Sequence, residues 1–192
     1  MRTHQNVLDN DLVRLFQNGD ELALEALIAR YKDKIFSTIF YLVKDRHLAE
    51  DLFQEVFIKI IDKLRSNSYN EEGKFLHWAL RISHNLCVDH FRKEKRNNTT
   101  SGDSSNLFDM LEICGDAADT KIVNGQIQEK VRVMLDLLPY EQREVIILRH
   151  FAELSFKEIA QLTNTSINTA LGRMRYGLIN LRKMMEENHM VL

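Results

Sequence analysis

The sequence has little of what extended or disulfide-stabilised proteins need. Its 192 residues include one proline and seven glycines, and β-branched residues seldom alternate with polar ones. This composition predicts helices throughout. The two cysteines, Cys87 and Cys114, do not form a disulfide framework, which favours a reducing compartment.

Long apolar runs are also missing. No run reaches the roughly 18 residues of a membrane span, and the N-terminus has no apolar core of signal-peptide length, so we expect a cytoplasmic protein. His84, Cys87 and His90 could approach a metal on a helix, but a fourth ligand is lacking. We expect a thiol and two helix-surface imidazoles, with no metal or cofactor. Because no nucleophile–base spacing is present, we also expect no catalytic activity and no small-molecule substrate.

The nearly neutral composition hides three charged segments. Residues 81–96 carry five cations and two acids (+3), residues 97–126 carry one cation and five acids (−4), and residues 167–183 carry four cations and no acid (+4). Attraction to phosphate acts locally, within about a Debye length of roughly 10 Å. Two basic patches separated by an acidic segment therefore indicate nucleic-acid contacts on two parts of the chain.

The acidic segment also loses helical periodicity and gathers Asn, Ser, Thr, Gly and Asp, as linkers do. We predict an all-α protein in which a flexible acidic linker, 97–126, joins a helical bundle, 1–96, to a four-helix domain, 127–192. The linker permits the domains to pack together or to stay apart. Two further helices, one short and capped and one long and basic, follow the predicted helices Asp9–Gln17, Asp20–Leu42, Leu48–Leu64, Phe75–Lys93, Ile127–Leu137 and Tyr140–Phe151.

The end of the chain has the pattern of a helix-turn-helix. Ser155 and Glu158 form a capping box, and Thr163–Thr165 is a polar break between two helices. In the second helix we predict a buried side formed by Ile167, Ala170, Leu171, Met174, Leu178 and Leu181, and an opposite side formed by Thr169, Gly172, Arg173, Tyr176 and Lys183, flanked by Asn168 and Arg175. Such a helix can enter the DNA major groove. The alternative is a helical hairpin with a solvated basic face.

Two earlier helices carry unusual exposed faces. Opposite its apolar stripe, the helix 48–64 places Ile58 on an acidic face, which indicates a docking surface or a stray surface isoleucine. The helix 75–93 aligns an aromatic ring and an amide with cations, a combination that suits single-stranded nucleic acid. Its predicted flank consists of Trp78, Arg81, Asn85 and Arg92. Trp78 could instead be half-buried core.

Three blocks, in order and spacing, resemble the extracytoplasmic-function (ECF) sigma factors, small two-domain members of the main bacterial sigma family. They are "AEDLFQEVFIKI", "FLHWALRISHNLCVDHFRKEKR" and "LLPYEQREVIILRHFAELSFKEIAQLTNTSINTALGRMRYGLINLRK". The resemblance covers almost the whole chain except its ends and the linker. It implies a non-catalytic subunit that binds core RNA polymerase and directs it to promoters. A stand-alone helix-turn-helix regulator is the alternative, although no dedicated dimerisation helix is evident.

The resemblance assigns the first block to the clamp helices of the largest polymerase subunit. The residues expected there are Asp51, Gln54, Glu55 and Ile58. The second block, with the loop before it, is expected to melt the promoter near position −10 and to capture an unstacked base, with Asn85 at the matching position. The full expected set is Asn67, Tyr69, Trp78, Arg81, Asn85 and Arg92.

The third block is expected to read the −35 element in duplex DNA. Here the chain departs from the family pattern, because Leu171 stands where a cation is common. Readout is therefore expected from Thr169, Arg173 and Tyr176, phosphate contacts from Arg175, Arg182 and Lys183, a base or phosphate contact from Asn168, and close backbone approach at Gly172. By analogy with relatives, an anti-sigma factor is a further expected partner.

Overall fold

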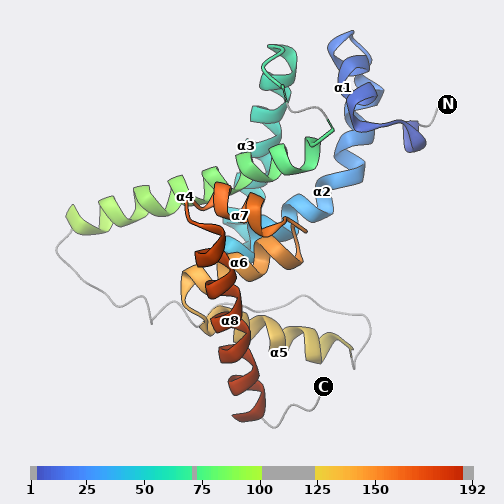
Figure 1. Ribbon diagram of the computed structural model, residues 1–192. Coiled ribbons are helices and arrows are strands. Elements are labelled where there is room, and N and C mark those ends of the chain that lie inside the picture. The colour runs from blue at the N-terminus through green and yellow to red at the C-terminus, as the bar shows by residue number, and fades with distance from the viewer. Residues whose placement is uncertain (1–3, 71–72, 101–123, 188–192) are drawn as a thin grey trace.

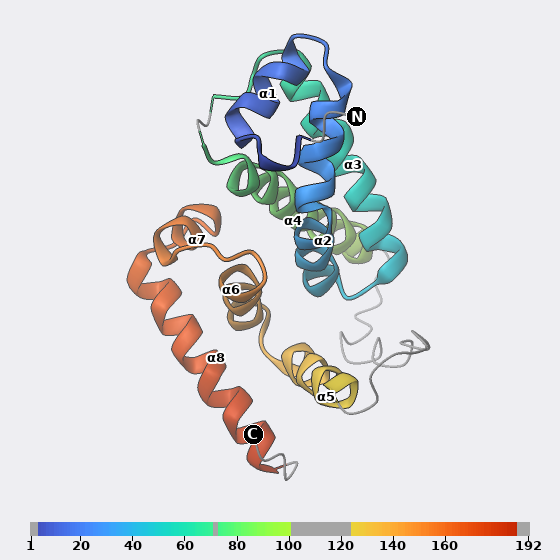
Figure 2. The ribbon, with the colours of Figure 1, turned by 90° about the vertical axis from the view of Figure 1, so that its right-hand side faces the viewer.

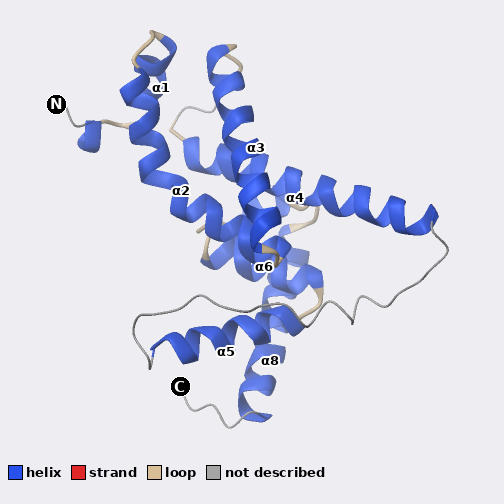
Figure 3. Ribbon diagram, turned by 180° about the vertical axis from the view of Figure 1, so that it is seen from behind, coloured by secondary structure: helices blue, strands red, loops and turns tan. Residues whose placement is uncertain are grey.

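The computed structural model describes residues 4–70, 73–100 and 124–187, and the secondary structure of these residues is helical, without strands (Figure 3). The all-α prediction is confirmed. In chain order the elements, shown in Figure 1, are the short 3₁₀ helix η1 (His4–Asn6), α1 (Asp9–Gln17), α2 (Glu21–Val43), α3 (Arg46–Arg65), α4 (Phe75–Thr100), α5 (Asn124–Leu137), α6 (Tyr140–His150), α7 (Phe156–Leu162) and α8 (Ile167–Glu187).

Local capping determines where the long N-terminal helices begin and end. The carboxylate of Asp20 accepts a hydrogen bond from the backbone N–H of Leu22 (3.0 Å) at the start of α2. Lys44 ends α2 in the left-handed conformation, with φ of 64°. Asp45 immediately caps α3 by accepting from Leu48 N–H (2.9 Å). The caps at Asp20 and Asp45 satisfy backbone groups that would otherwise be unpaired. Lys44 and Asp45 are the two residues that connect α2 to α3.

Helices α1 to α4 form a bundle around an apolar core. In α3 the predicted apolar stripe is buried at Leu52, Val56, Ile60 and Leu64, and in α4 Phe75 and Ala79 are also buried. The acidic side of α3 faces away from this core. The amphipathic pattern therefore predicted both the buried and the exposed sides of this helix.

Helices α7 and α8 have helix-turn-helix geometry. Both hydrogen bonds of the predicted capping box are present: Glu158 N–H donates to Ser155 Oγ (3.3 Å), and Ser155 N–H donates to Glu158 Oε2 (2.8 Å). Burial alone would raise the pKa of Glu158, but the hydrogen bonds from Ser155 lower it. In the turn, Asn164 adopts φ of 53°, a conformation that Asn tolerates better than most residues.

The predicted buried side of α8 is partly wrong. Ile167, Leu171 and Leu178 are 46%, 43% and 49% exposed. The buried residues of α8 are Ala170 and Gly177. Since α8 lies at the outer edge of the molecule (Figure 2), it packs through a narrow strip of small residues, with Met174 and Leu181 partly buried beside them.

The two halves of the chain pack against each other, an arrangement that the sequence left open. A stripe on α4 with heptad spacing, His77, His84 and Phe91, faces α6 and α7. Nδ1 of His77 lies 3.2 Å from Glu158, Nε2 of His84 lies 2.9 Å from Glu144, and the ring of Phe91 lies edge-on to the ring of Tyr140. Figures 1 and 2 both place α4 beside α6 and α7.

The second half of α2 contributes another part of this interface. The ring of Tyr41 stacks on that of Phe151, with 4.2 Å between centroids. Lys34 pairs with Glu153 at 2.8 Å, and Lys44 pairs with Asp136 at 3.2 Å. Buried residues of both halves consequently belong to one apolar cluster.

His84 corrects a further expectation. Its imidazole was predicted on the helix surface but is 4% exposed. The Glu144 carboxylate accepts a second hydrogen bond, from the hydroxyl of Tyr140 at 2.9 Å. Burial, and then the nearby Glu144, raise the pKa of that phenol. Glu144 and His84 can be buried because they bond to each other across the interface, and Tyr140 satisfies the same carboxylate from within α6.

Candidate polymerase and DNA surfaces

The predicted polymerase-docking set lies together on the outer face of α3. Asp51, Gln54, Glu55 and Ile58 are all exposed, and Ile58 is 60% exposed. Glu55 also pairs with Lys59 one turn further along, at 3.2 Å. The face therefore presents one apolar side chain among acidic and amide groups, and none of the four residues is used by the protein's own core.

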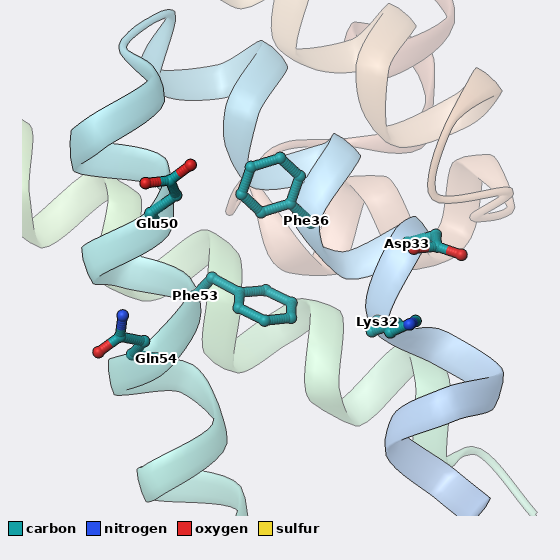
Figure 4. A pocket seen from close by; sticks show the side chains of 6 residues that line it. All are labelled: Lys32, Asp33, Phe36, Glu50, Phe53 and Gln54. Carbon is teal, nitrogen blue, oxygen red and sulfur yellow. The ribbon is translucent and has the colours of Figure 1, made fainter.

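A hollow adjoins this face between α2 and α3 (Figure 4). It is open to solvent and has a volume of about 380 Å³. Two rings form its apolar part, Phe36 and Phe53, which meet edge-to-face at a centroid distance of 5.6 Å. Charged and amide groups surround them, and the complete lining is Lys32, Asp33, Phe36, Glu50, Phe53 and Gln54.

The predicted −10 residues are only partly assembled on one surface. Arg81, Asn85 and Arg92 are exposed along α4, and Asn67 is exposed in the loop before it. Their spacing of four and seven residues places the α4 side chains on one side of the helix. The four exposed groups can hydrogen-bond to bases and attract phosphate.

Of the two alternatives for Trp78, the structure contradicts the exposed base-stacking group and agrees with core. The indole is 5% exposed, and the ring of Tyr69 meets it edge-on with centroids 4.8 Å apart. Phe75 lies 5.8 Å away on the same side. The position on α4 that seemed to form a flank with Arg81 is covered by the α3–α4 loop. Trp78 is thus core in this structure and holds Tyr69, while its ring is not available for stacking on a base.

The predicted −35 residues line the outer side of α8. Asn168, Thr169, Arg175, Tyr176, Arg182 and Lys183 are exposed, whereas Gly172 and Arg173 are half-buried. Four of them, Thr169, Gly172, Arg173 and Tyr176, share a hollow of about 370 Å³ with the start of α6, where Pro139, Glu141 and Gln142 complete the lining. The side chains expected to read bases therefore surround one concave surface.

Sequence reasoning missed the residue that orients the start of α8. Ser166 Oγ accepts a hydrogen bond from Thr169 N–H at 3.0 Å and lies 2.8 Å from Thr169 Oγ1. The serine caps the helix and holds the threonine hydroxyl. A serine three residues before a threonine, at the first turn of an amphipathic helix, was the available signal.

Three arginines of the C-terminal half bond within the protein. Arg143 donates to the carbonyl of Leu42 (3.4 Å), and burial lowers its pKa to about 10. Arg149 donates to the carbonyl of Leu154 (2.9 Å), and the guanidinium of Arg132 lies 4.4 Å from the ring centre of Phe40. These contacts indicate a structural role for the three side chains.

Comparisons with known proteins match both halves. The family model "Sigma-70 region 2" matches residues 27–97, and "Sigma-70, region 4" matches residues 128–171. The ECF RNA polymerase sigma factor SigX of Bacillus subtilis is 30% identical over 174 residues, covering 86% of this chain and 85% of SigX. The chain belongs to the ECF sigma factors. SigW of the same organism is 27% identical over 180 residues, covering 91% of this chain and 95% of SigW.

Solved structures share the fold of this sigma factor. The sigma factor RpoE of Bartonella quintana, in complex with the anti-sigma factor NepR, superposes with a TM-score of 0.69, at 20% identity, over 85% of this chain and 96% of RpoE. CnrH, in complex with the cytosolic domain of CnrY, superposes with a TM-score of 0.66, at 19% identity, over 93% of this chain and 97% of CnrH. At these identities the likeness concerns the fold.

Family membership establishes the general function. The protein is a sigma factor for promoter-specific transcription initiation, and the alternative of a stand-alone regulator is not favoured. Sigma factors are non-catalytic subunits of RNA polymerase. Within the residues that the structure describes, no helix has the length and apolar character needed to span a bilayer.

Truncation of Trp78 tests whether the indole is core or a base-stacking group. Trp78→Ala is expected to lower the free energy of unfolding by about 3–5 kcal/mol, because it leaves a cavity between Tyr69 and Phe75. The exposed residue Asn85 provides the control, and Asn85→Ala should change stability by less than about 0.5 kcal/mol. Denaturant unfolding of both variants measures this. Equal stability of the two would contradict the core assignment.

Proposed function

We propose that residues 1–96 bind core polymerase and the −10 element, that residues 127–192 read the −35 element, and that residues 97–126 connect them. The observation that carries this proposal is that three separate faces, of two opposite charges, are exposed on three different helices. The acidic face with Ile58 is on α3, and the two cationic faces are on α4 and α8. A protein that joins a basic polymerase surface to two DNA segments needs this separation.

The α3 face is suited to the clamp helices of the largest subunit. Carboxylates at Asp51 and Glu55 would attract a basic coiled coil and set its orientation. Ile58 supplies a small apolar centre that is desolvated on docking, as binding hot spots require. The adjoining Phe36–Phe53 hollow extends this surface toward α2.

Charge reversal at Glu55 tests the docking face. Glu55→Arg should weaken association with core polymerase, because it places a cation against the basic partner, and should leave the fold intact, because the residue is exposed. Glu187→Arg is the matched control, since Glu187 is also exposed and pairs with a lysine four residues away. Co-elution with core polymerase in gel filtration measures association. Equal binding by both variants would remove Glu55 from the docking set.

On α4 we assign base capture to Asn85. Its exposed amide can both donate to and accept from the edge of an extruded base. Arg81 and Arg92, on the same side of the helix, would bind the neighbouring phosphates. Extrusion costs a few kcal/mol, and contacts available only to the extruded base favour the melted promoter without nucleotide hydrolysis.

On α8 we assign base reading to Thr169, Arg173 and Tyr176, which lie around one hollow. Exposed cations beyond it, Arg175, Arg182 and Lys183, would bind phosphates and hold the helix in register. Base contacts specify a sequence, whereas phosphate contacts only position the protein. The two groups of residues should therefore respond differently to substitution.

That difference gives the second test of the proposal. Arg173→Ala should lower discrimination among −35 sequences by about 1–3 kcal/mol if the guanidinium contacts a guanine. Arg175→Ala should weaken binding to all −35 sequences by a similar factor, since a phosphate contact carries no sequence information. Enrichment by the polymerase holoenzyme from promoter fragments randomised at −35 measures both. If Arg173→Ala weakens binding to all −35 sequences equally, Arg173 contacts a phosphate and not a base.

The packed arrangement of the two halves cannot read both promoter elements at once. The −10 and −35 elements lie about 25 base pairs apart, or about 85 Å at about 3.4 Å per base pair. In the structure α4 contacts α7 through His77 and Glu158, and α7 adjoins α8. Two helix-packing distances of about 8–10 Å each separate the two DNA-reading helices. We therefore assign this structure to the free protein, with the halves separating on polymerase.

Glu144 provides the test of this closed state. Glu144→Ala should shift the protein toward the open form, because Tyr140 and His84 lose their acceptor in the interface at a cost of about 1–3 kcal/mol per buried group. A larger radius of gyration in X-ray scattering is expected. Because the halves are separated in the proposed complex, apparent affinity for core polymerase should rise with the open fraction.

The control is Glu141→Ala, on the same helix but exposed. Helix content from circular dichroism separates opening from unfolding. An unchanged radius for a folded Glu144→Ala variant would mean that this contact does not hold the halves together.

We further propose an anti-sigma factor as a partner, because RpoE and CnrH were solved with such a protein or with the cytosolic domain of CnrY. The sigma factor would act without catalytic activity of its own and where polymerase and promoter DNA are located, in the cytoplasm. Run-off transcription with core polymerase on genomic fragments tests the function as a whole. Promoter-specific transcripts are expected, and separate elution from core polymerase at low salt would contradict the proposal.

A further inference from the structure

Helix α8 makes its closest approach to α6 at Gly177. A Cβ atom built on this glycine would lie 2.8 Å from Cδ1 of Ile146 and 3.4 Å from Cβ of Gln142. The carbonyl oxygen of Gln142 would be 3.6 Å away. A carbon–carbon distance of 2.8 Å is well below the roughly 3.5–4.0 Å of normal contact. A methyl group at residue 177 therefore requires the terminal methyl of Ile146 to move, whereas its distances to Gln142 are close to those of normal contact.

Two neighbouring contacts hold α6 and α8 at this distance. The amide of Asn180 donates to Oε1 of Gln142 at 2.8 Å. Ile146 is 6% exposed and belongs to an apolar cluster with Leu135 and Leu138, so its terminal methyl cannot rotate away without disturbing that cluster. A glycine inside a helix is less favourable than alanine, and this close contact is the physical reason for glycine here.

The same helix contact borders the side chains assigned to base reading. Gln142, which touches Gly177 and Asn180, also lines the hollow with Thr169, Arg173 and Tyr176. Arg173 is four residues from Gly177, or about 6 Å along the helix at about 1.5 Å per residue. A shift of α8 at Gly177 is therefore transmitted along a rigid helix to these side chains.

We propose that Gly177 is a positioning residue for −35 recognition, which fixes the depth of α8 against Ile146 and Gln142 and thereby the projection of Thr169, Arg173 and Tyr176. The inference rests on the proposed role of α8 in reading the −35 element. Directional hydrogen bonds to base edges require placement to about 0.5 Å, whereas the clash with a methyl group at 177 displaces one helix from the other. Gly177 itself contacts no DNA.

The test is enrichment by holoenzyme from promoter fragments randomised at both −35 and −10. Gly177→Ala is expected to lower −35 enrichment about fivefold or more, the scale of one lost base contact. Enrichment at −10 should not change, because α4 is untouched. The double variant Gly177→Ala, Ile146→Val removes the Cδ1 atom that clashes and should restore −35 enrichment, while Ile146→Val alone controls for the smaller core residue.

The outcomes separate positioning from stability. Gly172→Ala, in the same helix with nothing within 4 Å of its Cβ, serves as a thermal-unfolding control for the gain in helix propensity. Equal −35 enrichment by Gly177→Ala and wild type would overturn the inference, as would a parallel loss at −35 and −10. Should Gly177→Ala not fold, a folded double variant with wild-type enrichment supports the proposal, and one that has lost −35 enrichment overturns it.

Failure of the proposed function would look different. In that case the wild-type holoenzyme itself would enrich no sequence at −35, and this inference would fall with it. A wild type that enriches normally leaves only the role of Gly177 to be decided by its variants.

Discussion

The carboxylate of Glu144 is the polar contact on which the arrangement of the two halves depends. It lies in the interface between α4 and α6, where His84 comes from one half and Tyr140 from the other. A buried carboxylate without partners is strongly unfavourable. Tyr140 supplies one partner from the same helix, so the bond that depends on how the halves meet is the one to His84. The contact therefore selects one alignment of the two halves. The stacking of Tyr41 on Phe151 adds buried apolar area to the interface, and the neighbouring ion pairs add charge complementarity.

The faces that we assign to polymerase and DNA lie outside that interface. The packed sides of α3, α4 and α6 carry apolar, aromatic or paired polar groups, and their outer sides carry the acids and cations that other molecules can meet. In α8 the division is sharper, because Ala170 and Gly177 are its buried residues. Most of its circumference remains exposed and is available for the DNA contacts that we propose for it. A helix that packs through its smallest side chains presents the largest share of its surface to a partner.

Helix positions and the exposed α3 face could be predicted because they depend on signals within one helix. The capping residues Asp20 and Ser155 and the apolar stripe of α3 are such local signals. Periodicity identifies a buried side but not what covers it. For that reason His84 was misplaced and Trp78 was left between an exposed flank and the core, since their neighbours come from α6 and from the α3–α4 loop. The role of Gly177 was missed because a residue without a side chain adds nothing to an apolar pattern.

The exposed position of the α3 face in the closed protein has a kinetic consequence. If polymerase docks on α3 as proposed, attachment does not have to wait for the halves to part, because Asp51, Gln54, Glu55 and Ile58 are already accessible. Association is then a bimolecular capture whose observed rate rises with polymerase concentration, followed by a first-order rearrangement whose rate reaches a ceiling. The order of the two steps, attachment and then opening, thus follows from the exposure of one side of α3.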